Sequence, residues 1–418
     1  MKVVIMAGGR GKRISSVSND VPKPMIRIEG KPVLEHEIIC LRNQGFTDII
    51  LTVGYMSNVI MDYFKDGSQF GVHIEYFVEE CPLGNAGALF RIKDRLTEDF
   101  LLLNADAMFD VDFNRFVEYH KSHNGLVTLF THPNSHPYDS GLIIADKSGV
   151  VLQWLTKEDD RPEFYQNRVN AGLHVISPKI LDVEMDMPKV DLDRQILKPL
   201  SGTGLMYVYD SSEYVKDMGT PDRYECVCHD FRVGKVKAKN LSNKQKAIFL
   251  DRDGVINKYV GFLRDINQFE LIDGVAEAVK KINESGNLAI VVTNQPVIAR
   301  GEVSFEQLQE IHNKMETLLG KEGAYLDGIY FCPHHPHKGY DGEISWLKCE
   351  CECRKPKPGM LLKAAKEYNI DLSKSWMIGD SESDLKAGEL AGCKTAFIGI
   401  GKYDNCYANL LDFVLDVL

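Results

Sequence analysis

The sequence has no apolar run that approaches the roughly 20 residues of a membrane-spanning helix. Its first residues, MKVVIMAGGRGKR, also lack the long apolar core of a signal peptide. Positive charge is in deficit: the formal net charge is −11, which argues against a protein that binds nucleic acid by neutralising phosphates. These absences predict a cytoplasmic protein that binds small molecules and neither membranes nor nucleic acid. Thiols stay reduced in the cytoplasm, so clustered cysteines there are expected to bind metal.

Two common nucleotide-binding motifs are also missing. The glycine-rich stretch MAGGRGKR has Arg13 where a Walker A loop needs Ser or Thr, and its glycines do not fit the G-x-G-x-x-G spacing of a dinucleotide-binding turn. A phosphate site built on this stretch must therefore belong to another class of protein.

The pattern of apolar segments predicts an α/β protein with two domains. At 418 residues the chain is too long for one core. KVVIMAGG and KAIFLDRDG each begin a half in which buried strands alternate with helices, which is typical of Rossmann-like folds. The stretch between them is polar and rich in lysine. We therefore predict domains at 1–235 and 246–418, joined by a linker at 236–245.

Four features of the second half indicate phosphoryl transfer. FLDRDG ends a strand with Asp251 and Asp253, two close carboxylates that are compatible if Mg²⁺ lies between them or if one keeps a proton. IGDSESD ends another strand with Asp380 and Asp384, a spacing suited to metal binding. The other two features are a neutral donor for phosphate oxygens and a pair of cations: Thr293, and Arg354 with Lys355. Residues just past the ends of parallel strands meet at one edge of the sheet, so we expect one site.

A sulfur-rich stretch precedes the cations. CPHHP places Cys332 and His334 two residues apart, and CECEC places three more cysteines at alternate positions. A C-x-H and C-x-C pair in a reducing compartment indicates a closed structural Zn²⁺ site, and a solvated hairpin is the alternative. The pattern alone leaves open which four residues bind, because it offers these candidates: Cys332, His334, His335, His337, Cys349, Cys351 and Cys353.

The first half offers glycine loops and two distant carboxylates. Glycines let backbone N–H groups approach phosphates, and CPLGNAGAL is a second glycine loop that can lie flat against a base. Lys23 lies between two prolines that stiffen its backbone. Asp106 ends the apolar strand LLLNAD, and Asp217 follows YVK. Two carboxylates that converge on one metal ion are what a triphosphate substrate requires.

Residues 246–400 resemble the haloacid-dehalogenase (HAD) phosphatase superfamily, and within it the histidinol-phosphate/heptose-bisphosphate phosphatase group. The matching motifs are DRDGVIN, TNQPVIARG, CPHHP, CECRKPKPGM and IGDSESD. The resemblance implies a parallel sheet with a zinc-binding loop, Asp251 as the nucleophile that becomes an aspartyl-phosphate, and Asp253 as the acid and base. It implies Mg²⁺ on the side chains of Asp251 and Asp380 and the carbonyl of Asp253. The other implied assignments are phosphoryl binding by Thr293 and Lys355, substrate binding by Asn294, Gln295 and Arg354, and Zn²⁺ binding by Cys332, His334, Cys351 and Cys353.

Residues 1–232 resemble sugar-1-phosphate nucleotidyltransferases. The matching motifs are GGRGKR, PKPM, GKPVLEH, PLGNAGAL, NAD, VNAGLHV and KDMGTPDRY. The resemblance implies a mixed, GT-A-like sheet and attack by a sugar 1-phosphate on the α-phosphorus of a nucleoside triphosphate. The implied assignments are phosphate binding by Arg13 and Lys23, Mg²⁺ binding by Asp106 and Asp217, nucleotide binding by Gly8, Gly9, Gly11, Gly84 and Gly87, sugar binding by Asn170, and sugar-phosphate binding by Lys157.

Together the two resemblances imply a bifunctional enzyme. The phosphatase would convert D-glycero-D-manno-heptose 1,7-bisphosphate to the 1-phosphate, and the transferase would add a nucleotidyl group, with GTP as the expected donor by resemblance. Two alternatives remain: a first half that only senses sugar nucleotides, and a phosphatase for histidinol phosphate or another sugar phosphate.

Overall fold

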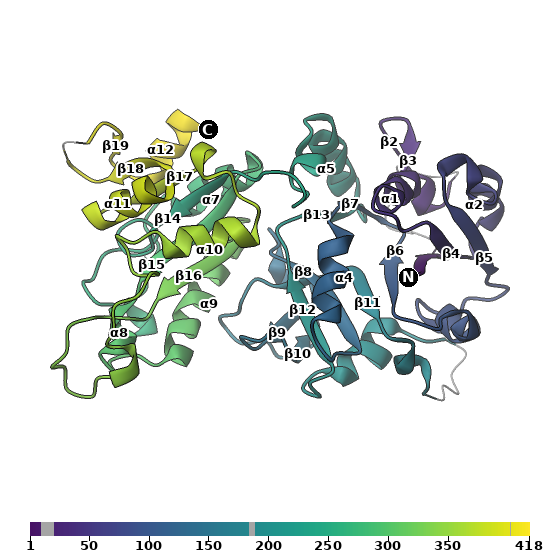
Figure 1. Cartoon of the computed structure of the whole chain (residues 1–418). Helices are drawn as coiled ribbons and strands as arrows, with labels where there is room; N and C mark the ends of the chain where they lie inside the picture. Colours follow the sequence, from purple (N-terminus) through teal and green to yellow (C-terminus); the bar gives the residue numbers. More distant parts are fainter. Residues whose placement is uncertain (10–20, 184–188, 402) are drawn as a thin grey trace. The chain divides into compact units, whose positions relative to one another are not determined.

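A computed structural model describes residues 1–9, 21–183, 189–401 and 403–418 of the chain (Figure 1). Within it the backbone divides into two compact units, each with its own sheet. Unit 1 comprises Met1–His132, Ile143–Leu155 and Asn170–Asn240. Unit 2 comprises Pro133–Leu142, Thr156–Val169 and Leu241–Leu418. Two short segments of the first half therefore belong to unit 2, whereas the sequence predicted two uninterrupted halves.

Unit 1 contains a mixed sheet, which confirms the predicted sheet type. Its strands are β1 (Val3–Ala7), β4 (Asp48–Val53), β5 (His73–Val78), β6 (Phe100–Asn104), β8 (Val127–His132), β9 (Leu142–Ala145), β10 (Val151–Leu155), β11 (Val169–Ile176) and β12 (Met206–Asp210). Their order in the described residues is β10-β9-β11-β6-β1-β4-β5, and β8 pairs with both β11 and β12. β1 is parallel to β4 and β6, whereas β11 runs antiparallel to β6.

Two short ribbons and several helices complete unit 1. The ribbons pair β2 (Arg27–Ile28) with β3 (Lys31–Pro32), and β7 (Ala107–Asp110) with β13 (Tyr214–Asp217). The helices are α1 (Val33–Arg42), α2 (Ser57–Phe64), α3 (Gly87–Arg91), α4 (Phe113–Lys121), α5 (Pro221–Arg232) and α6 (Lys235–Ala238). Alternate residues of β1 enter different cores: Val3 and Ile5 pack on one face of the sheet, and Val4 packs on the other. This burial on both faces explains why β1 is a continuous apolar run.

Unit 2 contains a parallel sheet, as predicted for the second half. Its strands are β14 (Ala247–Leu250), β15 (Leu288–Asn294), β16 (Gly328–Cys332), β17 (Trp376–Gly379), β18 (Lys394–Ile398) and β19 (Cys406–Tyr407). They are ordered β16-β15-β14-β17-β18-β19, and all neighbouring pairs are parallel. The helices are α7 (Val275–Glu284), α8 (Pro296–Ala299), α9 (Phe305–Lys321), α10 (Gly359–Glu367), α11 (Glu382–Ala391) and α12 (Leu410–Val417). β14 is central, so the residues that follow it lie at the middle of the carboxyl edge of the sheet.

The segment predicted as a linker is folded over much of its length. Val236 lies in α6, and both Val236 and Leu241 are buried. Asn240 donates from Nδ2 to Asp110 Oδ1 at 2.6 Å. Lysine-rich composition did not reveal this packing, in which Lys239 is buried along with Val236 and Leu241. Among the described residues, no helix has both the length and the apolar character needed to cross a bilayer.

Candidate active sites

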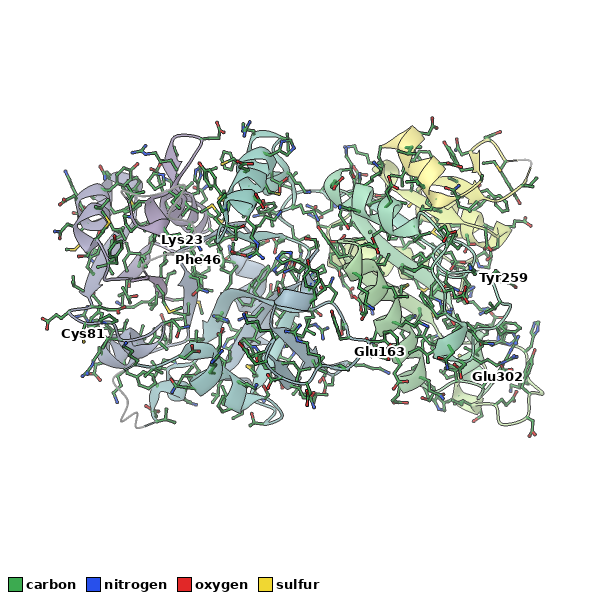
Figure 2. The ribbon with its side chains drawn as sticks, turned by 180° about the vertical axis from the view of Figure 1, so that it is seen from behind. Lys23, Phe46, Cys81, Glu163, Tyr259 and Glu302 are labelled. Carbon is green, nitrogen blue, oxygen red and sulfur yellow. The ribbon has the colours of Figure 1, made fainter. Side chains whose placement is uncertain are left out.

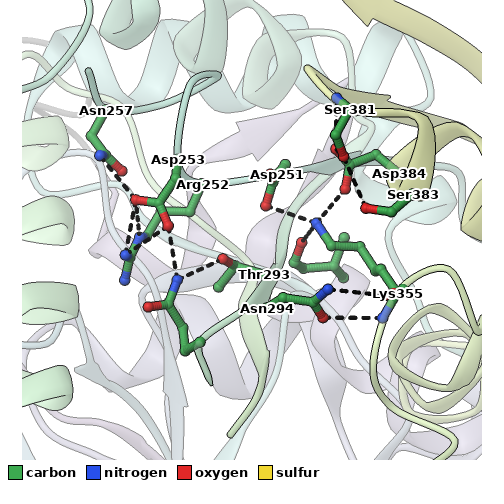
Figure 3. Close-up of polar contacts among 12 residues, drawn as sticks. Asp251, Arg252, Asp253, Asn257, Thr293, Asn294, Lys355, Ser381, Ser383 and Asp384 are labelled. Atoms are coloured by element: carbon green, nitrogen blue, oxygen red, sulfur yellow. Dashed lines mark hydrogen bonds and ion pairs between the residues drawn. The ribbon is translucent and has the colours of Figure 1, made fainter. Parts of the chain in front are cut away.

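The first site lies at the carboxyl edge of the unit 2 sheet. Asp251 directly follows β14, Thr293 is near the end of β15, and Asp380 directly follows β17. Because β14 pairs with both β15 and β17, the three strand ends lie side by side. Figure 3 shows Asp251 and Thr293 facing a common centre. The structure thus brings together the strand-end residues that the sequence predicted.

Lys355 reaches this centre from the loop before α10. Its Nζ donates to Asp251 Oδ1 at 2.7 Å and to the carbonyl of Val292 at 2.8 Å, and it pairs with Asp384 Oδ1 at 2.5 Å. The side-chain amide of Asn294 bonds the backbone N–H and carbonyl of Lys355, both at 3.0 Å. The ammonium is thus fixed beside Asp251, where it can neutralise charge on a phosphoryl group.

Asp253 is held by three neighbours. Arg252 Nη2 donates to both carboxylate oxygens at 2.9 Å, Asn257 donates to Oδ1 at 3.1 Å, and Gln295 donates to Oδ2 at 2.9 Å (Figure 3). Arg252 is fully buried, with His312 Nε2 at 3.4 Å from its Nη1. Burial and the Arg252 charge hold the pKa of His312 well below its ordinary value, so this imidazole is neutral. The sequence did not single out Arg252, Asn257 or His312, because they make their contacts behind the carboxylates.

The electrostatics of this centre fit a divalent cation. Burial raises the pKa of Asp251, although Lys355 opposes the rise. Burial also raises the pKa of Asp380 to about 6, and the nearby Asp384 adds to the rise. Carboxylate oxygens of these three residues lie within 4.8 Å of one another. A cation bound between hard oxygens would relieve this repulsion.

Gly254 is required by the approach of Asp380. It has φ of +88°, and a Cβ at this position would lie 2.0 Å from Asp380 Oδ2. Any side chain would therefore displace the carboxylate that the sequence assigns to Mg²⁺.

The Cys/His stretch brings four ligand atoms together. The Sγ atoms of Cys332, Cys351 and Cys353 and the Nδ1 of His334 all lie within 4.8 Å of one another. Cys332 Sγ is 3.2 Å from Cys353 Sγ, which is 3.3 Å from His334 Nδ1. Hydrogen bonding from Cys332 lowers the pKa of Cys353 to about 5. Soft sulfur and imidazole ligands at these separations suit Zn²⁺, whereas Cys349 is exposed and outside the group.

The second site is a cavity of about 770 Å³ in unit 1. Five residues that the sequence assigned to it are in its lining: Gly8, Gly9, Lys23, Gly84 and Asp106. Figure 2 labels two residues of this lining, Lys23 and Cys81. Gly84 has φ of +82°, and a Cβ there would lie 2.3 Å from the carbonyl of Val190. The second glycine loop therefore packs closely against the segment around Val190, which explains why position 84 is a glycine.

Both predicted metal ligands of unit 1 pair with cations. Lys23 Nζ donates to Asp106 Oδ2 at 2.7 Å, and Arg223 Nη1 donates to Asp217 Oδ2 at 2.6 Å. The two aspartates are close in the fold, because Asp217 of β13 pairs with Ala107 of β7. Each carboxylate is about 45% exposed. Two accessible hard-oxygen donors, one just before β7 and one at the end of β13, fit Mg²⁺.

The other predicted residues of unit 1 have different surroundings. Asn170 Oδ1 is 3.2 Å from His174 Nε2 and accepts from the N–H of Gly172. Lys157 is exposed in a segment of unit 2, and Gly87 begins α3. The predicted residues Gly11 and Arg13 lie outside the described residues.

Glu79 is a cavity residue that sequence reasoning missed. It follows β5, and its Oε2 accepts from the N–H of Leu83 at 3.3 Å. A Cβ placed on Gly8 would lie 2.7 Å from Glu79 Oε1, so this carboxylate borders the first glycine loop. Its position just before CPLGNAGAL was the available signal.

Comparison with known proteins defines the class of each half. The profile of the Nucleotidyl transferase family matches residues 2–229, and a HAD-hydrolase-like profile matches residues 352–416. The chain therefore belongs to the nucleotidyl transferase family and carries a second, HAD-type enzyme domain.

Individual relatives refine the second half. The chain is 46% identical over 155 residues to the D-glycero-beta-D-manno-heptose-1,7-bisphosphate 7-phosphatase of Yersinia pestis. This match covers 37% of this chain and 80% of that protein. It is 43% identical over 155 residues to the D-glycero-alpha-D-manno-heptose-1,7-bisphosphate 7-phosphatase of Burkholderia mallei, with the same coverages. The second half belongs to the family of these heptose-bisphosphate phosphatases.

Among solved structures, HddC from Yersinia pseudotuberculosis aligns with a TM-score of 0.48 at 27% identity, over 55% of this chain and 99% of that one.

Proposed function

We propose that the chain catalyses two successive steps in the activation of a heptose. The second half would remove the 7-phosphate of D-glycero-D-manno-heptose 1,7-bisphosphate, and the first half would join the resulting heptose 1-phosphate to a nucleotidyl group. The observation that carries this proposal is the presence on one chain of the Asp251–Lys355 centre and of the cavity lined by Lys23 and Asp106. The product of the first is an acceptor for the second.

In the phosphatase step, Asp251 attacks phosphorus and the bond to the sugar oxygen breaks. Asp253, fixed by Arg252, donates a proton to that oxygen and then takes one from the water that hydrolyses the aspartyl-phosphate. Lys355 neutralises charge on the phosphoryl oxygens. Mg²⁺ held by Asp251, Asp380 and the carbonyl of Asp253 would supply further neutralisation.

In the transferase step, an oxygen of the sugar phosphate attacks the α-phosphorus and pyrophosphate leaves. The glycine loops position the nucleotide, and Lys23 binds phosphate oxygens. Mg²⁺ on Asp106 and Asp217 would supply charge neutralisation.

We assign Zn²⁺ to the Cys/His group of unit 2 as a structural ion. The reduced thiols of this group fit a cytoplasmic enzyme.

The test is a coupled assay of the full chain with heptose 1,7-bisphosphate and each of the four nucleoside triphosphates. We expect phosphate release followed by a nucleotide heptose that mass spectrometry identifies. Faster hydrolysis of histidinol phosphate than of the bisphosphate, or no nucleotide sugar with any donor, would contradict the proposal.

Glu79 gives the expected preference for GTP a structural basis. A carboxylate offers two acceptors, and guanine presents two adjacent donors, N1–H and the N2 amino group. Uracil and thymine instead place carbonyl oxygens on both sides of N3–H, which a carboxylate repels. Burial raises the pKa of Glu79, and donors from a bound base would offset the loss of solvation.

We expect Glu79→Gln to reduce kcat/KM for GTP by about 10- to 100-fold, because one of two acceptors becomes a donor. Activity with UTP should stay level or rise. Glu80→Gln is the matched control, since Glu80 also lines the cavity but is exposed. An unchanged ratio of GTP to UTP activity in Glu79→Gln would remove Glu79 from base selection.

Removing the Cys/His ligands should separate the two activities. In Cys351→Ser/Cys353→Ser we expect loss of bound zinc and a fall in phosphatase activity of about 10- to 100-fold, since Cys353 directly precedes Arg354 and Lys355. Transferase activity should persist. Zinc content is measured by atomic emission, with Cys349→Ser as the control from the same loop. Stoichiometric zinc in the double variant would refute the ligand assignment.

A further inference from the structure

The ion pair between Arg223 and Asp217 occupies a carboxylate that the transferase needs for its metal. Asp217 Oδ1 accepts from the N–H of Gly219 at 2.8 Å, and Oδ2 accepts from Arg223 Nη1 at 2.6 Å. Both oxygens are thus engaged. A divalent cation that binds Asp217 through Oδ2 competes with the guanidinium of Arg223 for that oxygen.

The position of Arg223 suits such an exchange. It lies in the first turn of α5, after the cap residue Thr220, whose Oγ1 accepts from the N–H of Arg223 at 3.4 Å. The backbone of Arg223 is therefore anchored while its side chain, 27% exposed, extends toward Asp217. Gly219, bonded to the same carboxylate, lines the cavity together with Lys23 and Asp106. The ion pair of Arg223 and Asp217 therefore adjoins, through Gly219, the cavity to which we assign the nucleotide.

The chemistry of Asp217 and of a nucleoside triphosphate favours transfer of the Arg223 guanidinium from the carboxylate to the phosphates. A triphosphate carries more negative charge than one carboxylate, and the planar N–H fork of arginine matches phosphate oxygens in a bidentate manner. When a metal ion takes Asp217 Oδ2, phosphate oxygens brought by the same metal–nucleotide complex offer the guanidinium a new partner. Lys23 likewise pairs with the carboxylate of Asp106. The resemblance to nucleotidyltransferases already assigns Lys23 to phosphate binding.

We propose that Arg223 is an exchange residue, which holds Asp217 in the absence of nucleotide and binds phosphate oxygens of the nucleotide once metal has replaced it. This inference rests on the proposed transferase function. It predicts that Arg223 opposes binding of the bare metal ion and favours binding of the metal–nucleotide complex. A residue that only supports the fold would affect both in the same direction.

The test measures Mn²⁺ binding to the full, zinc-loaded chain by electron paramagnetic resonance, in an Asp380→Asn background that removes the phosphatase metal site. In Arg223→Gln we expect Mn²⁺ alone to bind about tenfold more tightly and Mn²⁺–GTP to bind about tenfold more weakly, as the loss of one charge-assisted hydrogen bond implies. Arg223→Lys keeps the charge without the fork, and we expect smaller shifts with the same signs.

Arg232→Gln is the matched control, because Arg232 lies in the last turn of the same helix and pairs with Glu29 at 3.2 Å. It should leave both affinities unchanged. If the two affinities in Arg223→Gln do not move in opposite directions, the proposal is wrong. Failure of the transferase function would be seen separately, as the absence of a nucleotide sugar with the unmodified chain, because the Mn²⁺ measurements involve no turnover.

Discussion

Asp251→Asn is expected to abolish phosphate release from heptose 1,7-bisphosphate, with a loss of about 10⁴-fold or more in kcat, as removal of a nucleophile costs other enzymes. The amide cannot form the acyl phosphate, and Lys355 loses one of its two negative partners, the one that its Nζ contacts at 2.7 Å. Nucleotidyl transfer to heptose 1-phosphate should continue at the wild-type rate, because Asp251 belongs to unit 2 and the transferase cavity is formed within unit 1.

Phosphate release and pyrophosphate release are measured on the same preparation, so each activity is an internal control for the other. Asp273→Asn, an exposed substitution in the same unit, controls for loss of an acidic charge. Retention of phosphatase activity in Asp251→Asn would exclude the aspartyl-phosphate mechanism. A parallel loss of both activities would indicate misfolding, which thermal melting of the variant detects.

Asp106→Asn is expected to have the opposite effect. Pyrophosphate release from GTP and heptose 1-phosphate should fall by about 10³-fold, on the scale reported for removing one preorganised charge-stabilising group. The substitution removes a metal-binding oxygen and the partner of Lys23. The control is Asp62→Asn, an exposed residue of α2. Wild-type pyrophosphate release in Asp106→Asn would remove Asp106 from the metal site, whereas no pyrophosphate release from the unmodified chain would favour the alternative in which the first half senses sugar nucleotides without turnover.

The phosphatase centre could be predicted because sequence position nearly determines spatial position there. Asp251 and Asp380 each directly follow a buried strand, and parallel strands of one sheet bring such residues to the same edge. The Cys/His group could be predicted as a cluster, because its cysteines and histidines fall in two short segments. The choice of four ligands among seven candidates came from the family resemblance, because spacing alone left it open.

The missed residues depend on contacts between segments far apart in the chain. Glu79 belongs to no glycine motif, and its importance follows from its approach to Gly8, some seventy positions earlier. Arg252 lies between two aspartates whose spacing indicates metal binding, and nothing in the sequence indicates that its guanidinium contacts both oxygens of Asp253. The predicted linker at 236–245 contains the boundary between the two units, after Asn240. Composition did not show that Val236 and Leu241 are buried there, because it records only how polar a segment is on average.

Gly254 has a consequence for reading related sequences. A Cβ at this position would lie 2.0 Å from Asp380 Oδ2, so any other amino acid would force that carboxylate to move. A homologous chain that keeps both aspartates of the DRDG motif but has another residue here is therefore expected to place its Mg²⁺ ligands differently. In a fused protein of this kind, this codon is where one change would alter the phosphatase step and leave nucleotidyl transfer as it is.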